Sequence, residues 1–393
     1  MILPQVMDIG KPAIIVGKAV RLLRVLATKN RSSPLSTLPH VQRPPSSNLV
    51  LGLANKKTNG VRQYSDASSL TPPLCAQLKH RGLVQVVGED ASVFLQGLIT
   101  NDIRCLDHGC ATLYAMMLNV QGRVLYDMIV YNMGHSSIAH EQCYILECDS
   151  EATDEFVSLM KKYKIRKKVD ISNINSDYSL WALMPADEDA CIQQCDLVAS
   201  HPEQLTVCAS DPRLQSFGCR MILPVETEAC SMFHGGCKTS TLEEYHRRRY
   251  KLGIGEGIVD LPPGNCFPLE CNAVFLNGVS FNKGCYIGQE LTARTHHTGV
   301  IRKRLMPIVL ASEDMQPVPG DSIENFANKN CGKFRNSVGI YGLALLRVAE
   351  ALGKGPLTIK HNEESVGEAS TQVPPWWPKD YTTDEIPGYN VAS

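Results

Sequence analysis

The sequence lacks most of the short motifs that identify a protein's chemistry. Its 15 cysteines include no Cys-x-x-Cys pair, and their number is odd. The closest spacing, Cys191 with Cys195, and the next one, which includes Cys266 with Cys271, do not match the common zinc knuckles. A disulfide framework is therefore not expected, and most of the cysteines are predicted to be small buried residues in a reducing compartment.

Catalytic and nucleotide-binding signatures are absent as well. No Gly-x-Gly-x-x-Gly segment follows a strand-like run, and neither Gly-x-Ser-x-Gly nor His-Glu-x-x-His occurs. These absences argue against dinucleotide binding, a hydrolase nucleophile elbow and a zinc protease. The GIGEG segment at 253–257 follows a predicted helix, which indicates a helix stop and not a phosphate cradle.

The charge balance and the hydropathy exclude two classes of partner. The formal net charge is −1, from 39 basic and 40 acidic residues, so no nucleic-acid partner is expected, although YHRRRYK at 245–251 forms a local basic patch. No apolar run is long enough to span a bilayer, so no membrane partner is expected. With 393 residues and 44% hydrophobic content, the chain is predicted to form two or three globular units.

The first 65 residues differ from the rest of the chain. They contain ten basic residues and a single acidic one, Asp8, among many serines, threonines and prolines. This composition is typical of a mitochondrial transit peptide, with a disordered tail as the alternative, and it predicts a location in the mitochondrial matrix.

Hydrophobic periodicity predicts an α+β protein with antiparallel sheets. Strands are expected at 81–88, 110–120, 122–133, 143–148, 169–174 and 178–184, with 110–133 as a hairpin, and helices are expected within 89–103, 151–165 and 241–252. The sequence beyond 290 becomes rich in strands and turns and predicts a small all-β unit. The tail at 374–393 is expected either to dock through its two tryptophans or to be disordered.

One segment places a thiol in an unusual frame. FNKGCYIGQE at 281–290 puts Cys285 directly after Gly284, where backbone can approach a ligand, and near Lys283, whose charge favours a thiolate. One thiolate cannot complete the four-ligand sphere of zinc or iron, so a metal at Cys285 needs ligands from elsewhere. The alternative is a buried cysteine in a structural turn. The adjacent His296 and His297 are expected to point to opposite faces of a strand and not to share a site.

Three stretches carry a family resemblance: RRRYKLGIGEG, FPLECNA and GVSFNKGCYIGQELTART, with FLQGLITNDI and MLNVQGRVLYDMIVY upstream. Over about residues 70 to 350 the chain resembles the folate-binding YgfZ branch of the aminomethyltransferase (glycine cleavage T-protein) superfamily, whose hallmark is a KGCYxGQE loop. With its leader, it most resembles the mitochondrial iron-sulfur cluster assembly factors of that branch.

The resemblance implies a fold and a set of domains. The fold is a three-domain ring of two mixed α+β domains and a C-terminal β-barrel around a central folate-type channel. The implied boundaries are a leader at 1–65, a first domain at 66–175 interleaved with 235–297, a second segment at 176–297 that ends in the KGCYIGQE loop, a barrel at 298–370 and a tail at 371–393.

The resemblance also implies a function. It predicts support for the maturation of 4Fe-4S proteins of the aconitase and radical-SAM types, together with A-type scaffold proteins. Cys285 would be the metal ligand, in a 2Fe-2S cluster shared with the scaffold, and the motif residues around it would support the loop: Lys283, Gly284, Gly288, Glu290 and Arg294. Tetrahydrofolate would bind in the channel, and the lining predicted for it is Asn119, Arg123, Asp127, Glu270, Tyr286 and Gln289.

One departure from the superfamily bears on the reaction. Aminomethyltransferases usually carry two adjacent acids after the glycine turn, and this sequence has Tyr126 and Asp127 there. The assembly factor is therefore the main hypothesis and is not expected to be an enzyme. The alternative is a folate-dependent one-carbon transferase with Asp127 as its base, and a folate-binding module without chemistry is a third reading.

Overall fold

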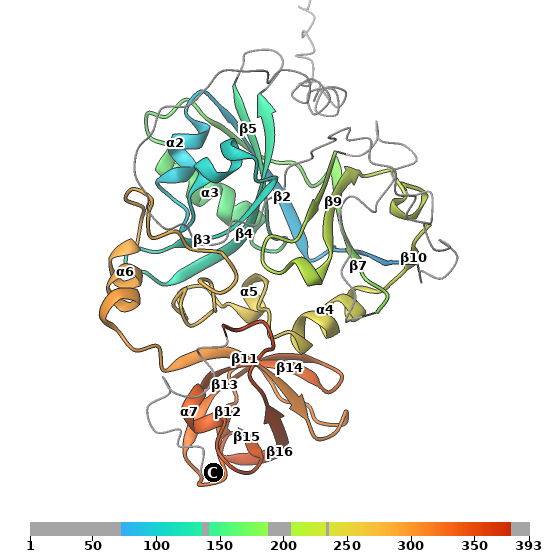
Figure 1. The fold of residues 1–393 in the computed structure, drawn as a ribbon, viewed down its shortest axis with the longest axis vertical. Helices are drawn as coiled ribbons and strands as arrows, with labels where there is room; N and C mark the ends of the chain where they lie inside the picture. The colour runs from blue at the N-terminus through green and yellow to red at the C-terminus, as the bar shows by residue number, and fades with distance from the viewer. Residues whose placement is uncertain (1–71, 136–140, 188–205, 233–235, 379–393) are drawn as a thin grey trace, which may run out of the picture.

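The computed structural model describes residues 72–135, 141–187, 206–232 and 236–378. Two β-sheets lie beside each other in the upper half of Figure 1, and a closed β-barrel forms the lower half. Between them lie two helices, α4 (Leu242–Lys251) and α5 (Gly257–Asp260). The predicted leader at 1–65 and the tail beyond 378 fall outside the described residues.

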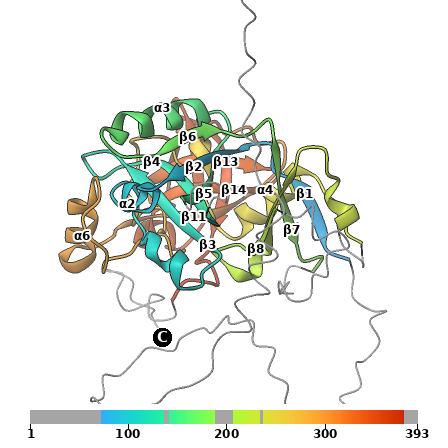
Figure 2. The ribbon, with the colours of Figure 1, turned by 90° about the horizontal axis from the view of Figure 1, so that it is seen from above.

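The first sheet has the strand order β3-β4-β5-β2-β6, and all its neighbouring pairs are antiparallel. Its strands are β2 (Arg81–Gly88), β3 (Thr112–Leu118), β4 (Val124–His135), β5 (Gln142–Asp149) and β6 (Asp170–Asn173). Its outer face is covered by α2 (Ala91–Gln96) and α3 (Thr153–Lys164), with the 3-10 helix η3 (Ile103–His108) next to α2. Figure 2 shows α3 lying over this sheet.

The second sheet has the order β10-β1-β7-β9-β8. Only its β1–β10 pair is parallel. Its strands are β1 (Leu74–Gln77), β7 (Tyr178–Met184), β8 (Val207–Ser210), β9 (Cys219–Pro224) and β10 (Lys238–Thr239). The short 3-10 helices η5 (Gln215–Phe217) and η6 (Ala229–Met232) lie in the connections around β9.

The largest core lies between the two sheets. Alternate residues of the first sheet, such as Tyr114 and Ile145, pack against Leu180 and Ile222 of the second sheet. Because side chains alternate along a strand, the opposite faces form separate cores, one under the helices of the first sheet and one beside η6. This arrangement leaves charged strand residues in the central layer, where they pair with one another.

The barrel is closed, with the strand order β11-β14-β13-β12-β15-β16. Its strands are β11 (Lys303–Leu310), β12 (Ser322–Glu324), β13 (Asn330–Val338), β14 (Tyr341–Arg347), β15 (Leu357–His361) and β16 (Glu364–Thr371), and α7 (Val348–Ala351) follows β14. Trp377 is buried against the barrel, and the indole N–H of Trp376 donates to the Leu252 carbonyl at 2.6 Å. The described part of the tail therefore docks on the body of the protein through its two tryptophans, which was one of the two predicted alternatives.

The predicted α+β class, the hairpin and the C-terminal all-β unit are confirmed. Two expectations are wrong. The segment after the thiol loop forms a helix, α6 (Gln289–Thr298), before the first barrel strand, and the YHRRRYK segment is not a surface patch because Arg248 and Arg249 are buried. The helix predicted within 89–103 also ends early, at Gln96.

The ring around a folate channel and the domain boundaries stay predictions. Strand β1 lies in the second sheet, although it comes from the segment assigned to the first domain. Among the described residues, no helix is long and apolar enough to cross a membrane.

Candidate functional site

Cys285 lies on a loop that is fixed to the end of α2. The Lys283 ammonium donates to three backbone carbonyls, those of Gln96 at 2.8 Å, Ile99 at 2.6 Å and Asn101 at 2.7 Å. The Ile287 amide donates to the Gly97 carbonyl at 3.1 Å. These carbonyls follow a helix end and have no partner within α2, so the loop supplies the donors that they need.

The three hydrogen bonds define what Lys283 does in the motif. They use all three donors of the ammonium group, and the ammonium nitrogen also lies 4.8 Å from the centre of the Tyr286 ring. Burial lowers the pKa of Lys283 to about 8. Lys283 therefore anchors the loop, and its predicted role as a counter-charge for a thiolate or a cluster stays a prediction.

Two glycines allow the loop to rest on the β3–β4 hairpin turn. Gly288 has a left-handed backbone, with φ +77°, and a Cβ built there would lie 2.3 Å from the Asn119 carbonyl oxygen. Gly122 in the turn has φ +79°, and its Cβ would lie 2.9 Å from the Gly288 carbonyl oxygen. Each glycine therefore makes room for the other segment's backbone.

Gln289 and Tyr286 close the turn that follows Cys285. The Gln289 side-chain oxygen accepts from the Tyr286 amide at 3.2 Å, and the Gln289 amide donates to the Tyr286 carbonyl at 3.3 Å. Tyr286 is buried, and burial raises the pKa of its hydroxyl to about 12. Both residues were predicted to line a folate channel, and the structure shows them holding the loop.

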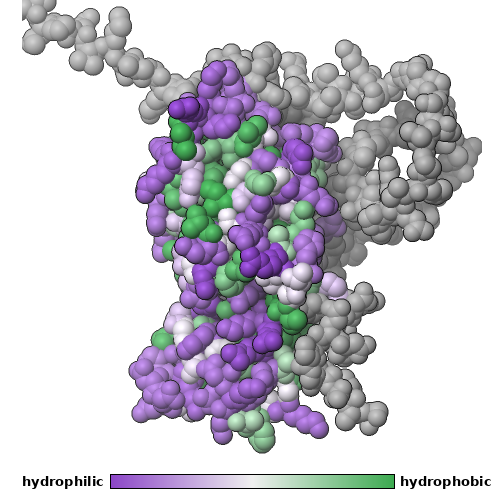
Figure 3. Space-filling model, turned by 90° about the vertical axis from the view of Figure 1, so that its left-hand side faces the viewer, coloured by the Kyte–Doolittle hydropathy of each residue, from purple (hydrophilic) through white to green (hydrophobic). Residues whose placement is uncertain are grey.

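Cys285 itself is exposed at this fixed position. Gly284 before it is exposed as well, and a Cβ added there would meet no atom within 4 Å. The elements that hold the loop carry exposed apolar side chains: Val93 on α2, Val120 in the hairpin turn and Val300 after α6. Figure 3 views the side of the molecule on which α6 lies and shows apolar surface scattered among polar residues. The Cys285 side chain is thus accessible from solvent.

Helix α6 corrects the expectation for the histidine pair. His296 and His297 are on a helix, where consecutive residues lie about 100° apart and not on opposite faces. The His296 ring stacks on Phe281, with ring centres 3.7 Å apart, and His297 contacts the same ring edge-on at 6.0 Å. Glu290 and Arg294 form an exposed ion pair one turn apart. Both sit on the surface of the helix that begins at the loop.

Three other residues predicted to line the folate channel, Asn119, Arg123 and Glu270, are engaged in local contacts. The Asn119 side-chain oxygen accepts from the amides of Gln121 and Arg123 within its own turn, and Glu270 accepts from the Phe267 amide. The Arg123 guanidinium lies over the Phe267 ring, 4.5 Å from its centre. Each of these side chains thus stabilises a local turn or loop.

Asp127 is also fully engaged. It is buried, its two oxygens accept from Arg81 at 3.3 Å, and one of them also accepts from the Gly257 amide at 2.9 Å. The six side chains are thus engaged in contacts within the protein, and the folate lining assigned to them stays a prediction.

Tyr126, the residue before Asp127, faces the core under the helices of the first sheet. Tyr126 packs edge-on against Phe156 of α3, in the core under the helices, and burial raises the pKa of its hydroxyl to about 12. Because neighbouring strand residues point to opposite faces, Tyr126 and Asp127 do not meet in one pocket.

Sequence reasoning missed a buried network of charges between the two sheets. Glu256 accepts from Arg213 at 2.7 Å and from Arg220 at 2.9 Å, and it also bonds His80 at 2.7 Å. Burial alone would raise the pKa of Glu256, but the surrounding arginines outweigh it and hold that pKa well below its usual range. Further members are Arg81, Asp127, Tyr131, Glu147, Asp211, Tyr245, Arg249 and Asp260.

A signal for this network was present in the sequence. Glu147 stands in the predicted strand CYILEC, and Arg220 stands in the apolar run CRMILP, so each is a charge among apolar neighbours. Such charges must be paired inside the protein. The GIGEG segment likewise does more than end a helix, because a Cβ at Gly257 would lie 2.4 Å from an Asp149 carboxylate oxygen.

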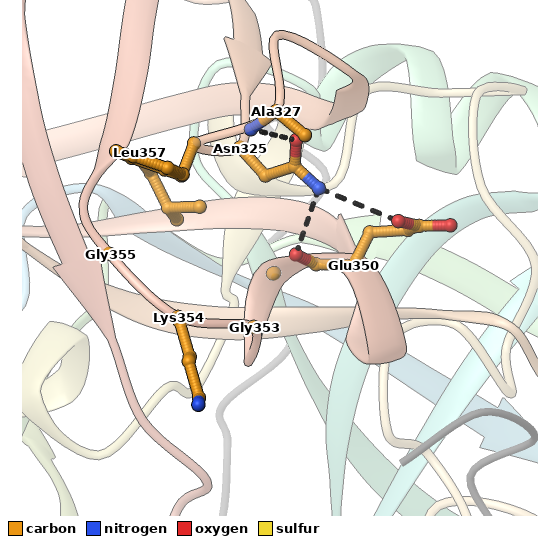
Figure 4. A pocket seen from close by; sticks show the side chains of 9 residues that line it. Asn325, Ala327, Glu350, Gly353, Lys354, Gly355 and Leu357 are labelled. Atoms are coloured by element: carbon orange, nitrogen blue, oxygen red, sulfur yellow. Dashed lines mark hydrogen bonds between the residues drawn. The ribbon is translucent and has the colours of Figure 1, made fainter. Parts of the chain in front are cut away.

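A small pocket of about 160 Å³ lies in the barrel, away from all these residues. Asn325, Glu350 and Leu357 contribute to its lining, and Figure 4 shows the Asn325 side chain donating to Glu350 across it. None of the residues predicted for metal or folate lines this pocket.

Comparison with known proteins defines the class to which this fold and loop belong. The GCVT N-terminal domain model matches residues 75–203, and the CAF17 C-terminal beta-barrel domain model matches residues 302–379. A solved structure, the glycine cleavage system aminomethyltransferase T from Bartonella henselae, superposes with a TM-score of 0.56 at 14% identity, covering 78% of this chain and 87% of that one. The fold is therefore that of the GcvT/CAF17 (YgfZ) family.

Curated relatives narrow the family further. The mitochondrial iron-sulfur cluster assembly factor IBA57 of Mus musculus is 40% identical over 321 residues, 77% of this chain and 85% of that protein. The Homo sapiens protein of the same name is 40% identical over 319 residues with the same coverage, and the Mycosarcoma maydis homologue is 31% identical over 411 residues. The chain belongs to the IBA57 family.

Proposed function

We propose that the chain is a mitochondrial iron-sulfur cluster assembly factor and that Cys285 ligates a 2Fe-2S cluster shared with an A-type scaffold protein. The observation that carries the proposal is the exposed thiol of Cys285 on a loop anchored to both α2 and the β3–β4 hairpin. A buried Cys285 would have been incompatible with it. Support for the location comes from the leader composition and from relatives that are named as mitochondrial.

The ligand count requires a partner. Four donors hold a 2Fe-2S cluster, and Cys285 supplies one thiolate, so the remaining donors come from the scaffold. The exposed valines around the loop offer apolar contact area, and Arg294 would exchange its ion pair with Glu290 for the anionic cluster. The products of this assembly would be 4Fe-4S proteins of the aconitase and radical-SAM types.

The structure favours this function over one-carbon transfer. A general base must reach the proton that it removes. Asp127 is buried, and its carboxylate is held by Arg81 and the Gly257 amide, so it acts as part of the ion-pair network. Tyr126 lies on the other face of the strand and cannot replace the second acid.

Anaerobic reconstitution tests the proposal. A 2Fe-2S-loaded A-type scaffold is mixed with the wild type, Cys285→Ser or Cys110→Ser, and the visible absorption of the complex is measured after size exclusion. Cys110 is a matched control because it is also exposed but precedes β3, whereas the loop contacts the far end of that strand, roughly 20 Å away.

Cluster absorption is expected to stay with the wild-type and Cys110→Ser complexes and to be lost with Cys285→Ser. Binding of the cluster-free scaffold should survive in Cys285→Ser, because the surrounding surface is unchanged. Equal absorption in all three complexes would show that Cys285 is not a ligand.

A further inference from the structure

Three other cysteine thiols meet at the edge of the second sheet. Cys75 is in β1, Cys230 is in η6, and Cys237 directly precedes β10. Their sulfur atoms all lie within 4.8 Å of one another, and those of Cys230 and Cys237 are 2.6 Å apart. In the part of the chain that the structure describes, no other three histidine, cysteine or acidic side chains meet this spacing.

Folding alone creates this cluster. Strand β1 pairs in parallel with β10, so that Cys75 lies opposite Thr239, and Cys237 lies two residues before Thr239. Cys75 faces the small core beside η6, where Met221 and Met232 also pack, and η6 brings Cys230 to the same place. More than 150 residues separate Cys75 from Cys230 in the sequence, which is why no short spacing motif could show the site.

The surroundings differ from those of an ordinary buried cysteine. Cys75 is completely buried, whereas Cys230 and Cys237 are half-buried, so the cluster has an inner end and an end near solvent. Hydrogen bonds from the thiols of Cys75 and Cys230 lower the pKa of Cys237 to about 7. Three cysteine sulfurs at this spacing offer, once deprotonated, the donors that soft cations prefer.

We propose that Cys75, Cys230 and Cys237 form a three-thiolate site for one thiophilic cation, with Zn²⁺ as its test ion. Thiolates at about 2.3 Å from a tetrahedral Zn²⁺ are roughly 3.8 Å apart, a separation that the cluster reaches if Cys230 and Cys237 open slightly. Binding replaces protons: three thiols that become thiolate ligands of one Zn²⁺ release three H⁺. Water from the half-buried end, where Cys230 and Cys237 lie, would fill the fourth position.

The spacing fits a single ion and not an iron-sulfur cluster. Of any three thiolates that hold a 2Fe-2S or 4Fe-4S cluster, at least one binds a different iron atom from the others and therefore lies farther from them than donors to one ion do. The site also lies on the opposite side of the molecule from α6 and the Cys285 loop, as Figures 1 and 2 show. It is thus independent of the proposed cluster ligand.

Metal content tests the proposal on the full-length protein. The chain is purified with a thiol-free reductant, stripped with a chelator, incubated with Zn²⁺ and desalted, and zinc per chain is measured by mass spectrometry. The variants are Cys230→Ser and Cys237→Ser, which change half-buried side chains, with Cys285→Ser and Cys110→Ser as controls. Circular dichroism checks that each variant is folded.

The wild type and both controls are expected to retain about one Zn²⁺ per chain, and Cys230→Ser and Cys237→Ser to retain almost none. Co²⁺ in place of Zn²⁺ should give thiolate charge-transfer absorption that the same two variants lose. Zinc affinity should also fall at acidic pH, because protons compete with the ion for the thiolates.

Three results would overturn the proposal. The first is a wild type that retains no zinc, and the second is zinc retention that is unchanged in both cluster variants. The third is a Cys230–Cys237 disulfide that persists under the reductant, which would make the pair a structural crosslink. Loss of zinc in Cys285→Ser alone would place the ion at the assembly loop instead.

Discussion

Gly288→Ala should detach the Cys285 loop from the β3–β4 hairpin, whereas Gly284→Ala should leave it in place. The left-handed backbone at Gly288 costs a residue with a Cβ about 1–2 kcal/mol. The new Cβ would also lie 2.3 Å from the Asn119 carbonyl oxygen, so the loop or the turn must shift. We therefore expect Gly288→Ala to destabilise the closed loop by about 2 kcal/mol, which is the upper end of the range for the backbone cost alone.

Gly284 is the matched control within the same motif. Its φ is outside the left-handed region, and a Cβ there meets no atom within 4 Å. An alanine at such a position is neutral or stabilises the protein by up to about 1 kcal/mol through the unfolded state. The two substitutions are chemically identical and lie four residues apart, so a difference between them reports the local geometry.

Hydrogen exchange of the Ile287 amide is the most direct assay. This amide is bonded to the Gly97 carbonyl when the loop is closed, and its protection reflects the free energy of local opening. A loss of about 2 kcal/mol corresponds to roughly 30-fold faster exchange in Gly288→Ala. Gly284→Ala should stay within about threefold of the wild type.

The same pair also tests the functional role of the loop. Gly288→Ala should weaken retention of the 2Fe-2S cluster by the scaffold complex, because the thiol is then less firmly positioned. If both variants exchange like the wild type, or if Gly284→Ala shows the larger effect, the contact between the loop and the hairpin does not position Cys285.

Three further predictions concern the buried charge network, the cluster of Cys75, Cys230 and Cys237, and the predicted folate channel. In urea titrations, Glu256→Gln should lower the free energy of unfolding by about 3–5 kcal/mol, because it leaves buried arginines uncompensated. The control Glu290→Gln, at an exposed position, should change the free energy of unfolding by less than about 0.5 kcal/mol. Alkylation of Cys237 by iodoacetamide, followed by peptide mass spectrometry without metal, should rise through an apparent pKa of about 7, and an apparent value near 9 would refute the lowered pKa. Calorimetry with tetrahydrofolate should give no saturable heat, because the predicted lining residues already contact one another or their own loops. Saturable binding that Arg123→Ala weakens would contradict this and show that these residues rearrange to admit the ligand.

Much of the fold was predictable because its strands and helices have regular hydrophobic periods. The β3–β4 hairpin and the strand at 178–184 agree closely with the sequence pattern. Helix α4 begins at Leu242, directly after Thr241, whose hydroxyl accepts from the Glu244 amide as expected for a helix N-cap. Helix α6 was missed because QELTARTHHT has few apolar residues and buries only Thr292. Its position depends on the loop before it and not on an apolar face of its own.

The sequence motif identified the main residue of the candidate site, but the contacts that hold the loop could not be predicted from it. The motif singled out Cys285, and the structure leaves that thiol exposed, but the partners of Lys283 are backbone carbonyls on a distant helix end. Similarly, the thiols of Cys75 and Cys237 are brought together by strand pairing between segments far apart in sequence. Contacts of this kind come from tertiary structure, which neither local spacing nor composition encodes.

The alternation of side chains along β4 explains why Tyr126 and Asp127 face different layers of the fold. Asp127 faces the central layer and is neutralised by Arg81, which also pairs with Glu147 of the neighbouring strand, so its charge joins β2, β4 and β5. Tyr126 faces the helix layer, where a carboxylate would be buried against Phe156 without a described cation beside it. Restoring an acid by Tyr126→Glu would therefore bury an unpaired charge and destabilise the protein without rebuilding an acid pair. The central layer thus acts as a rigid support, and the group that this support presents to solvent is the Cys285 thiol.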